Sequence, residues 1–191
     1  PKGSPFAPEP FSKLYQRSLF QNLRTLSLKA FDLLRNNLGK LSEPVREEAR
    51  ILLDNQEVLN DGFKPLMTKK INALRIRIHG DFHLGQLMFT GKDFQIIDFE
   101  GEPAKPVSER RIKRSALRDV AGMLRSFHYA SEWVLSSMKS TGMGDKAGET
   151  VLKACALRWY DWVRLIYLKA YTTEAREGRF LPQDKENLLF L

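Results

Sequence analysis

The chain has 191 residues and a formal net charge of +8, from 31 Lys and Arg against 23 Asp and Glu. With 42% hydrophobic residues, it is long and apolar enough to bury a core, which argues against intrinsic disorder. The single cysteine, Cys155, excludes an internal disulfide and multi-cysteine metal sites, and we expect it in the core. Because no membrane-spanning apolar run and no signal pattern occur, we expect a cytoplasmic protein without a membrane partner.

The first 73 residues predict a short extended entry followed by helices. Four prolines within residues 1–10 are typical of an extended, poorly ordered segment. From Ser12, apolar residues recur at spacings of three and four, which predicts a long helix that Gly39 ends. Ser42 is placed to cap a second helix over 43–59, which "NDG" at 60–62 breaks. A third, short helix is expected over 64–73.

The pattern changes to β-type between residues 74 and 99. The segment "LRIRIHG" (74–80) alternates apolar and basic residues, which predicts a strand. The segment "QLMFTGKDFQIIDF" (86–99) predicts two short strands joined by a tight turn at 91–93. Because the rest of the chain is helical in character, the expected fold class is α+β, mostly helical, with one small β hairpin.

The last 90 residues predict an irregular stretch and two long helices. Residues 101–114 match neither a helix pattern nor a strand pattern. Ser115 is placed to cap a helix whose apolar face runs over 117–138. A connector at 140–148 precedes a helix that ends near Gly178. Trp159 and Trp162 fall on its apolar side. Core packing is the expectation for both, and stacking on a sugar ring is the alternative.

A cluster of basic residues spans Lys105 to Arg125. Seven cations against Glu109 and Asp119 give this segment a local charge of +5. Such a cluster could meet phosphate on a nucleotide, a sugar or a nucleic acid, or it could be a solvated loop. We expect no nucleic-acid partner, because a nucleic-acid binder would leave the acidic residues just before the cluster unexplained.

Those acidic residues lie in "HGDFHLGQLMFTGKDFQIIDFEGEP" (79–103). Asp81 follows the first strand, and Asp98 follows the hairpin. Since a hairpin brings its ends together, Gln86 can approach Asp98 and Glu100. Carboxylate and amide oxygens are ligands that Mg²⁺ prefers, with waters and substrate phosphates completing the octahedron. Asp81, outside that group, could accept a proton from a substrate hydroxyl.

Together with "IIDFEGEP" and "LRDVAGMLRSFHYA", this segment resembles the maltokinase family, including maltokinase portions of trehalose synthase fusions. The family lies within the aminoglycoside phosphotransferase and choline kinase-like superfamily, and the three blocks match in order over 79–130. The resemblance implies phosphorylation of maltose to maltose 1-phosphate with ATP and Mg²⁺. It also implies maltose or a related sugar, and a fused or associated trehalose synthase, as partners.

The resemblance assigns a role to each residue of these blocks. It implies that Asp81 is the catalytic base, and that the metal ligands are Gln86 (where many relatives use Asn), Asp98 and Glu100. His83 and Arg118 would contact substrate, and Arg118 could also brace the metal loop through a carboxylate. His79 would hold the loop without proton chemistry. Asp119, in the first turn of a helix, is interpreted as a partner of the helix dipole.

The resemblance also implies a second lobe that binds ATP. Only residues 1–73 precede the catalytic segment, they are helical in pattern, and no G-x-G-x-x-G occurs before His79. We therefore expect residues 1–191 to be the helical C-terminal lobe, with catalytic and metal loops at 79–103, without the N-terminal lobe and inactive alone. The alternatives are a kinase lobe for another sugar, an aminoglycoside or a choline-like alcohol, and a non-catalytic regulatory module of a trehalose synthase fusion.

Overall fold

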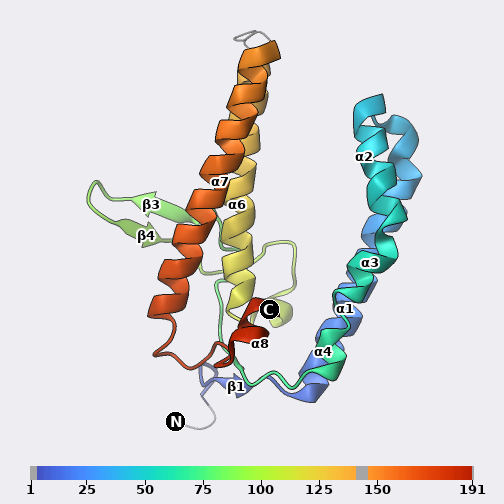
Figure 1. Cartoon of the computed structure of the whole chain (residues 1–191). Coiled ribbons are helices and arrows are strands. Elements are labelled where there is room, and N and C mark those ends of the chain that lie inside the picture. Colours follow the sequence, from blue (N-terminus) through green and yellow to red (C-terminus); the bar gives the residue numbers. More distant parts are fainter. Residues whose placement is uncertain (1–3, 141–145, 191) are drawn as a thin grey trace. The chain divides into compact units, whose positions relative to one another are not determined.

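The computed structural model describes residues 4–140 and 146–190, and the chain divides into two compact units. The first unit comprises Pro1–Glu9 and Ala73–Leu191, and the second comprises Pro10–Asn72. Both are mainly helical, and the strands are short, so the expected mostly helical α+β class is confirmed (Figure 1). Within the described ranges, no helix combines the length and apolar character that crossing a membrane requires.

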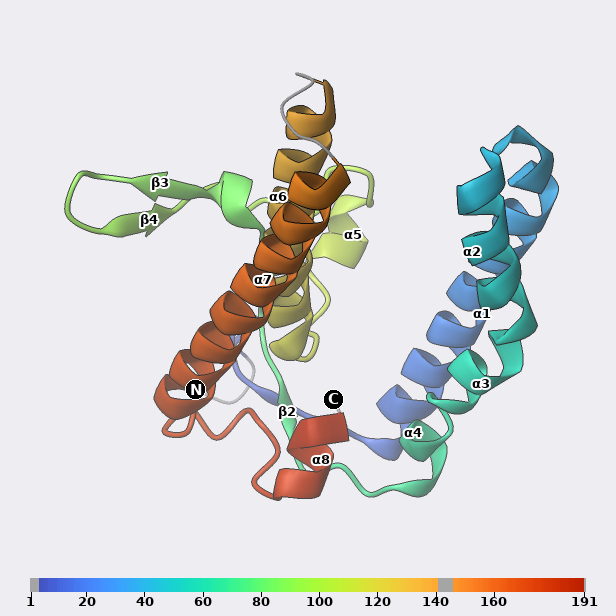
Figure 2. The ribbon, with the colours of Figure 1, turned by 45° about the horizontal axis from the view of Figure 1, so that its top comes forward.

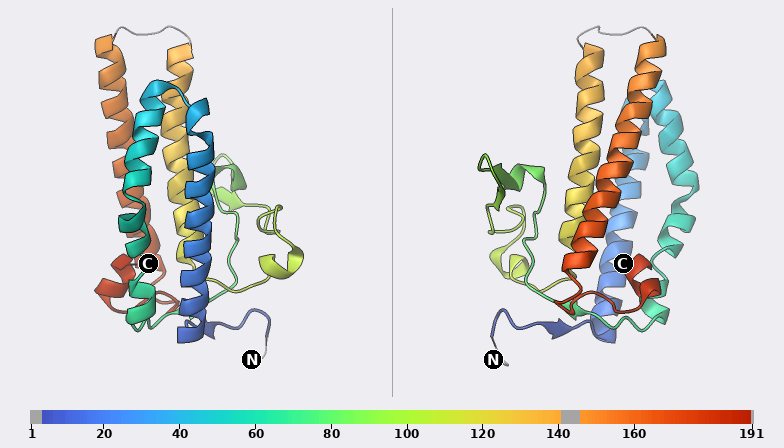
Figure 3. Two further views of the ribbon diagram at one scale, coloured as in Figure 1. Left: turned by 90° about the vertical axis from the view of Figure 1, so that its right-hand side faces the viewer. Right: turned by 60° about the vertical axis from the view of Figure 1, so that its left-hand side comes forward.

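The second unit is built around its first helix. Helix α1 (Lys13–Asn37) is followed by η1 (Leu38–Lys40), α2 (Glu43–Asp54), α3 (Gln56–Asp61) and α4 (Pro65–Thr68), which run back along α1 (Figure 3). The buried amide of Gln16 donates hydrogen bonds to the carbonyl oxygens of Leu66 and Lys69, at 2.9 and 3.0 Å. These bonds fix the start of α1 against α4, because an unpaired buried amide would be costly.

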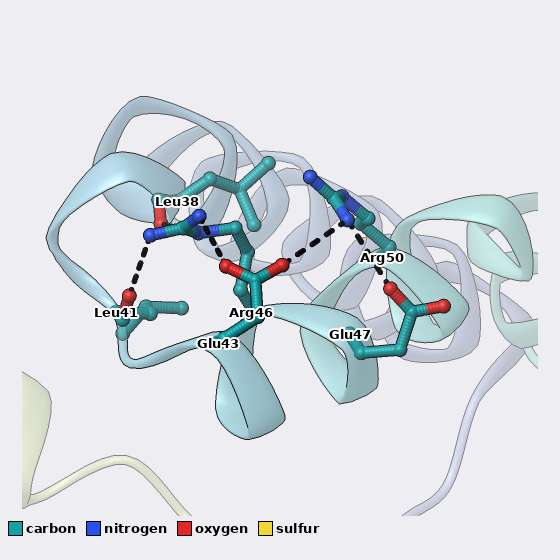
Figure 4. Close-up of polar contacts among 6 residues, drawn as sticks. All are labelled: Leu38, Leu41, Glu43, Arg46, Glu47 and Arg50. Atoms are coloured by element: carbon teal, nitrogen blue, oxygen red, sulfur yellow. Dashed lines mark hydrogen bonds and ion pairs between the residues drawn. The ribbon is translucent and has the colours of Figure 1, made fainter.

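Arg46 closes the turn between α1 and α2. Its guanidinium donates to the carbonyl oxygens of Leu38 and Leu41, at 3.1 and 2.9 Å, and lies 2.6 Å from the Glu43 carboxylate (Figure 4). Ser42, the expected cap, precedes α2 but makes no capping hydrogen bond with its side chain. Arg46 thus provides hydrogen-bond donors for the carbonyl oxygens of Leu38 and Leu41. Cationic side chains commonly bind free carbonyl oxygens near helix ends in this way.

The helix expected over 43–59 is interrupted at Asn55. Its side-chain amide donates to the carbonyl oxygen of Ile51 at 2.8 Å, and its backbone leaves the helical region at φ −94° and ψ 12°. Asparagine competes for backbone partners in this way, which favours helix ends over helix interiors. The sequence therefore gives two helices, α2 and α3, where periodicity alone predicts one.

Two long helices form the body of the first unit. Helices α6 (Leu117–Ser140) and α7 (Lys146–Glu174) lie antiparallel, side by side (Figure 1). Ring contacts join them: Phe127 meets Tyr167 edge to face at 5.6 Å between centroids, and His128 meets Tyr160 at 5.2 Å. Both helices were predicted, whereas the expected connector at 140–148 falls largely on 141–145, outside the described residues.

The sequence prediction chose the wrong face of α7 as its buried side. Cys155, Trp159 and Trp162 are exposed, so the expectation of core packing is wrong for all three. The face that packs on α6 carries Tyr160 and Tyr167, which are offset from the two tryptophans by about 80° to 160° around a helix of 3.6 residues per turn. Because α7 is apolar on both faces, the spacing of its apolar residues could not distinguish them.

The predicted hairpin is present, and the predicted strand before it is mostly absent. Strands β3 (Leu87–Phe89) and β4 (Phe94–Ile96) pair antiparallel, with Leu87 opposite Ile96 and Phe89 opposite Phe94. Strand β2 covers only Leu74–Arg75 of the segment 74–80. Beyond it, Ile76 forms an isolated bridge with Arg114. The alternating pattern here marks an extended segment that enters the loop carrying Asp81.

Two short helices were not predicted from the sequence. Helix α5 (Val107–Arg110) lies within the stretch expected to be irregular, with Pro106 at its start, and α8 (Lys185–Phe190) lies near the C-terminus. Each is a turn or two long, too short for a periodic apolar pattern to reveal.

An ion cluster ties the N-terminal segment to the rest of the first unit. Glu9 begins β1 (Glu9–Pro10), and its two carboxylate oxygens lie 2.7 Å from Arg75 and 2.8 Å from Lys113. The hydrogen bond from Lys113 lowers the pKa of Glu9 below its usual value, and the charges of Lys113 and Arg75 act in the same direction. The segment 1–10, expected to be extended and poorly ordered, is thus anchored at Glu9.

We expect this cluster to make stability depend on pH below about 4.5. Since folding lowers the pKa of Glu9, its contribution is present above the unfolded pKa and is lost as the pH falls through the folded value. Glu9→Gln should therefore lower the midpoint of thermal unfolding at pH 7, and this difference should shrink as the pH is lowered toward 3. Thermal melts of both proteins across that range test this. An equal difference at both pH values would contradict it.

Candidate functional site

The loop that carries Asp81 is attached to the first turns of α6. The Asp119 carboxylate accepts hydrogen bonds from the backbone N–H groups of His79 and Gly80, at 2.7 and 2.9 Å. Gly80 has a positive φ of 86°, which suits glycine and turns both N–H groups toward that carboxylate. Asp119 therefore acts as a positioning residue for the loop, in addition to lying in the first turn of α6, where the helix dipole favours an acidic residue.

Two further residues of α6 complete this attachment. Gly122 lies so close to the loop that a Cβ atom there would be 2.5 Å from the backbone oxygen of Phe82. Ser126 accepts a hydrogen bond from the N–H of Leu84 at 3.1 Å. Asp119, Gly122 and Ser126 are spaced by three and four residues, so they share one face of the helix. That spacing within "LRDVAGMLRSF" was the available signal for all three.

Removing the Asp119 carboxylate should loosen the loop. Asp119→Ala leaves two backbone donors without their charged acceptor, for which we expect a loss of about 2 kcal/mol of unfolding free energy. Asp119→Asn keeps an acceptor oxygen and should lose about half as much. Urea unfolding with hydrogen exchange at His79 and Gly80 tests both variants. Unchanged exchange at these two amides in Asp119→Ala would refute the positioning role.

His79 joins the Asp81 loop to the segment that leads into Asp98. Its ring is buried, and Nε2 lies 2.8 Å from the carbonyl oxygen of Ile97. The backbone N–H of Asp81 donates to Nδ1 at 3.4 Å, so Nδ1 is the acceptor and Nε2 carries the proton. The ring also contacts Phe82 and Phe99. The expectation that His79 holds the loop agrees with these contacts.

Gln86 and Asp98 lie side by side, as the hairpin argument predicts. Short helix η2 (Leu84–Gln86) leads directly into β3, so Gln86 sits at the base of the hairpin (Figure 2). The Nε2 atom of Gln86 is 3.3 Å from Oδ2 of Asp98. Asp98 follows β4 with a positive φ of 60°, an uncommon conformation for a residue other than glycine. Such local strain is typical of functional positions.

Glu100 lies apart from this pair. Its side chain is 80% exposed, and its carboxylate lies 3.8 Å from the guanidinium of Arg110. Neither a hydrogen bond nor an ion pair joins it to Gln86 or Asp98 among the contacts of the described residues. Likewise, within those residues no three His, Cys, Asp or Glu side chains gather as a metal site. Gln86 and Asp98 are the side chains that would bind a metal ion here, and the role of Glu100 as a ligand stays a prediction.

Ion pairs involve much of the basic cluster that follows residues 79–103. Glu102 contacts Lys105 and lies 3.5 Å from Arg118, which therefore braces the loop through a carboxylate. Arg110 and Lys113 pair with Glu100 and Glu9. These contacts indicate that the cluster mainly fixes the loop from 100 to 114 and does not form a free basic stripe.

An open cavity of about 640 Å³ lies between the catalytic loop and α6. The Asp81 side chain, 35% exposed, contributes to its wall, and Nε2 of His83 lies 4.0 Å from the Asp81 carboxylate. Arg118 lines the same cavity, so the structure brings three predicted site residues together. Its other lining residues are Gly80, Phe82, Leu84, Gly85, Glu102, Asp119, Gly122, Arg125, Ser126 and Tyr129.

A second, smaller cavity of about 210 Å³ involves the other side of the same loop. Tyr167 and Tyr171 of α7 line it, with their rings 6.3 Å apart. Burial raises the pKa of Tyr167 to about 12, helped by the neighbouring Tyr171 and by the Asp119 charge. Both tyrosines therefore stay neutral near pH 7. Their aromatic rings line one side of the loop that Asp119 anchors.

Comparisons with known proteins point to glucosamine kinases. A glucosamine kinase from Streptacidiphilus jiangxiensis is 35% identical over 60 residues, which cover 31% of this chain and 14% of that protein. One from Mycolicibacterium smegmatis is 38% identical over 53 residues, which cover 28% of this chain and 13% of that protein. The matched segments are thus about one seventh of the length of these curated relatives. No family model matches the chain.

The fold is also that of solved glucosamine kinases. The structure of a glucosamine kinase in complex with glucosamine, ADP and inorganic phosphate aligns with 96% of this chain and 41% of its own. The TM-score is 0.59 at 19% sequence identity. A second glucosamine kinase structure, crystal form B, aligns with 86% of this chain and 37% of its own, with a TM-score of 0.56 at 20% identity. At this identity, the similarity shows a shared fold.

Proposed function

We propose that the chain carries the catalytic centre of a sugar kinase, which transfers a phosphoryl group from ATP to a sugar hydroxyl. One observation carries the proposal: Asp81 lines a cavity of about 640 Å³, and the His79 ring links its loop to Ile97, directly before Asp98, which contacts Gln86. Similarity in sequence and fold to glucosamine kinases supports the same reaction class. The alignment of 96% of this chain with 41% of one such kinase supports residues 1–191 as one part of a longer kinase, and we propose that this part is the helical C-terminal lobe.

Asp81 acts as the base in this proposal. Its carboxylate lines the cavity, where a sugar hydroxyl would donate a hydrogen bond to it and then lose its proton as the oxygen attacks the γ-phosphorus. The anchored backbone of His79 and Gly80 keeps this carboxylate in place. Positioning of this kind provides most of the catalysis in phosphoryl transfer, because the protein forms no covalent bond with the phosphoryl group.

Gln86 and Asp98 would hold a magnesium ion once the Gln86 amide, whose Nε2 donates to Asp98, turns its Oε1 toward the ion. The two side chains present an amide and a carboxylate within hydrogen-bond distance of each other, and Asp98 is exposed at the base of the hairpin. Mg²⁺ commonly takes one or two such protein ligands and completes its octahedron with water and phosphate oxygens. When bound, the ion would neutralise charge on the transferring phosphates.

The acceptor is a sugar in this proposal, and two candidates have support. Maltose follows from the resemblance of residues 79–130 to maltokinases, which would also make a trehalose synthase a candidate fused or associated partner. Glucosamine follows from the names of the relatives. In either case His83 and Arg118, which line the cavity with Asp81, are placed to contact the sugar. A purely regulatory role is disfavoured because Asp81, Gln86 and Asp98 are all retained.

A direct assay tests the proposal. The natural full-length protein that contains this chain is incubated with ATP, Mg²⁺ and either maltose or glucosamine, and ADP and sugar phosphate are quantified. We expect ADP and sugar phosphate in equal amounts with at least one acceptor. The 191-residue chain should bind the same sugar in calorimetry. If no sugar supports ADP release and none binds, the chain is not the acceptor lobe of a sugar kinase.

A further inference from the structure

Aromatic side chains extend the cavity face of α6 beyond the catalytic loop. Tyr129 lines the cavity, and Trp133 follows four residues later, about 6 Å further along the helix. Asp119, Gly122, Tyr129 and Trp133 are spaced by multiples of three and four residues that keep them on one face. Trp133 is 72% exposed. A large aromatic ring exposed beside a cavity is a candidate contact for a ligand.

Packing within α6 and α7 does not account for Trp133. The contacts between these helices use Phe127 and His128, on the face of α6 opposite to the cavity. The side chain of Trp133 therefore points away from α7, toward the side on which the catalytic loop and the cavity lie.

Arg125 holds Tyr129 in place at the cavity wall. Its Nη2 and Nε atoms donate to the phenol oxygen at 2.6 and 3.2 Å, and the guanidinium carbon lies 5.0 Å from the ring centroid. Within the described part of the chain, no carboxylate lies within ion-pair distance of Arg125. Its remaining donors can therefore serve hydroxyl groups of a ligand in the same cavity.

We propose that Tyr129 and Trp133 form an outer subsite for a second sugar ring, so that the acceptor is a saccharide of at least two rings. This inference rests on the proposed function. A pyranose has an apolar face of C–H groups and a rim of hydroxyls, which match an aromatic ring and a nearby guanidinium. The cavity of about 640 Å³ falls among sites that hold ligands larger than one sugar ring, about 300–1,000 Å³.

Calorimetric titration of the 191-residue chain with glucosamine, maltose and maltotriose tests the subsite. The wild-type chain should bind maltose and maltotriose more tightly than glucosamine. Trp133→Ala should weaken maltose binding about five-fold, as expected for loss of one ring contact, and should change glucosamine binding by less than about two-fold. Trp162→Ala is the matched control, because this tryptophan is 67% exposed on α7 and does not line the cavity.

The outcomes distinguish failure of the outer subsite from failure of the proposed function. Equal effects of Trp133→Ala on glucosamine and maltose, or no effect on either, would overturn the outer subsite while the sugar kinase proposal stands. A wild-type chain that binds glucosamine as tightly as maltose would overturn it as well. If the wild-type chain binds none of the three sugars, both the subsite and the proposed function fail. Circular dichroism of each variant excludes unfolding as the cause of lost binding.

Discussion

Replacing Asp81 with Asn should lower sugar-dependent ADP formation by about a thousand-fold, within the range that a positioned base contributes. The amide retains the size and a hydrogen-bond acceptor but cannot take the proton of the attacking hydroxyl. The measurement is the rate of ADP release at saturating ATP and sugar, in the natural full-length protein. Sugar binding should fall much less, because the cavity walls are unchanged.

The fold should survive this substitution. The loop is held by the backbone of Asp81 and by Asp119, and the side chain within ion-pair distance of the Asp81 carboxylate is His83, at 4.0 Å. Asp161→Asn serves as the control, because Asp161 is an exposed carboxylate on α7 that pairs with Arg164. We expect normal activity from the control and an unchanged melting temperature for both. A rate within ten-fold of wild type would remove Asp81 as the base.

The sequence predicted the elements whose signals are local. Ser12 caps α1 through a hydrogen bond from Tyr15, and the turn after β3 is closed by Thr90 and Asp93. The proximity of Gln86 and Asp98 also followed from sequence, because a two-strand hairpin leaves little freedom for its ends. These features depend on residues within about a dozen positions of one another.

Features that depend on distant partners were missed. The role of Asp119 depends on backbone groups 39 and 40 positions earlier, so the spacing around Asp119 can mark a shared helix face but cannot identify these partners. Ring contacts with α6, and not the apolar content of α7, decide which face of α7 is buried.

Gly122→Ala should be the most damaging small substitution in α6. The added methyl group would lie 2.5 Å from the backbone oxygen of Phe82, well inside van der Waals contact, so either the loop or the helix must move. We expect a loss of about 3 kcal/mol of unfolding free energy, the upper part of the range for overpacking. This loss outweighs the gain in helix propensity of about 1 kcal/mol on replacing Gly with Ala. Urea unfolding measures the net effect.

Gly39→Ala is the matched control, because no atom lies within 4 Å of a Cβ placed there. It should change stability by less than about 0.5 kcal/mol, the usual limit for surface substitutions. Because Phe82 directly follows Asp81, the displaced loop should also carry the base out of position, so residual folded Gly122→Ala should be far less active than wild type. Wild-type stability and activity in Gly122→Ala would mean that the loop is not seated on α6. The hydrogen bonds assigned to Asp119 and Ser126 would then lose their support as well, since all three contacts lie on one face of one helix.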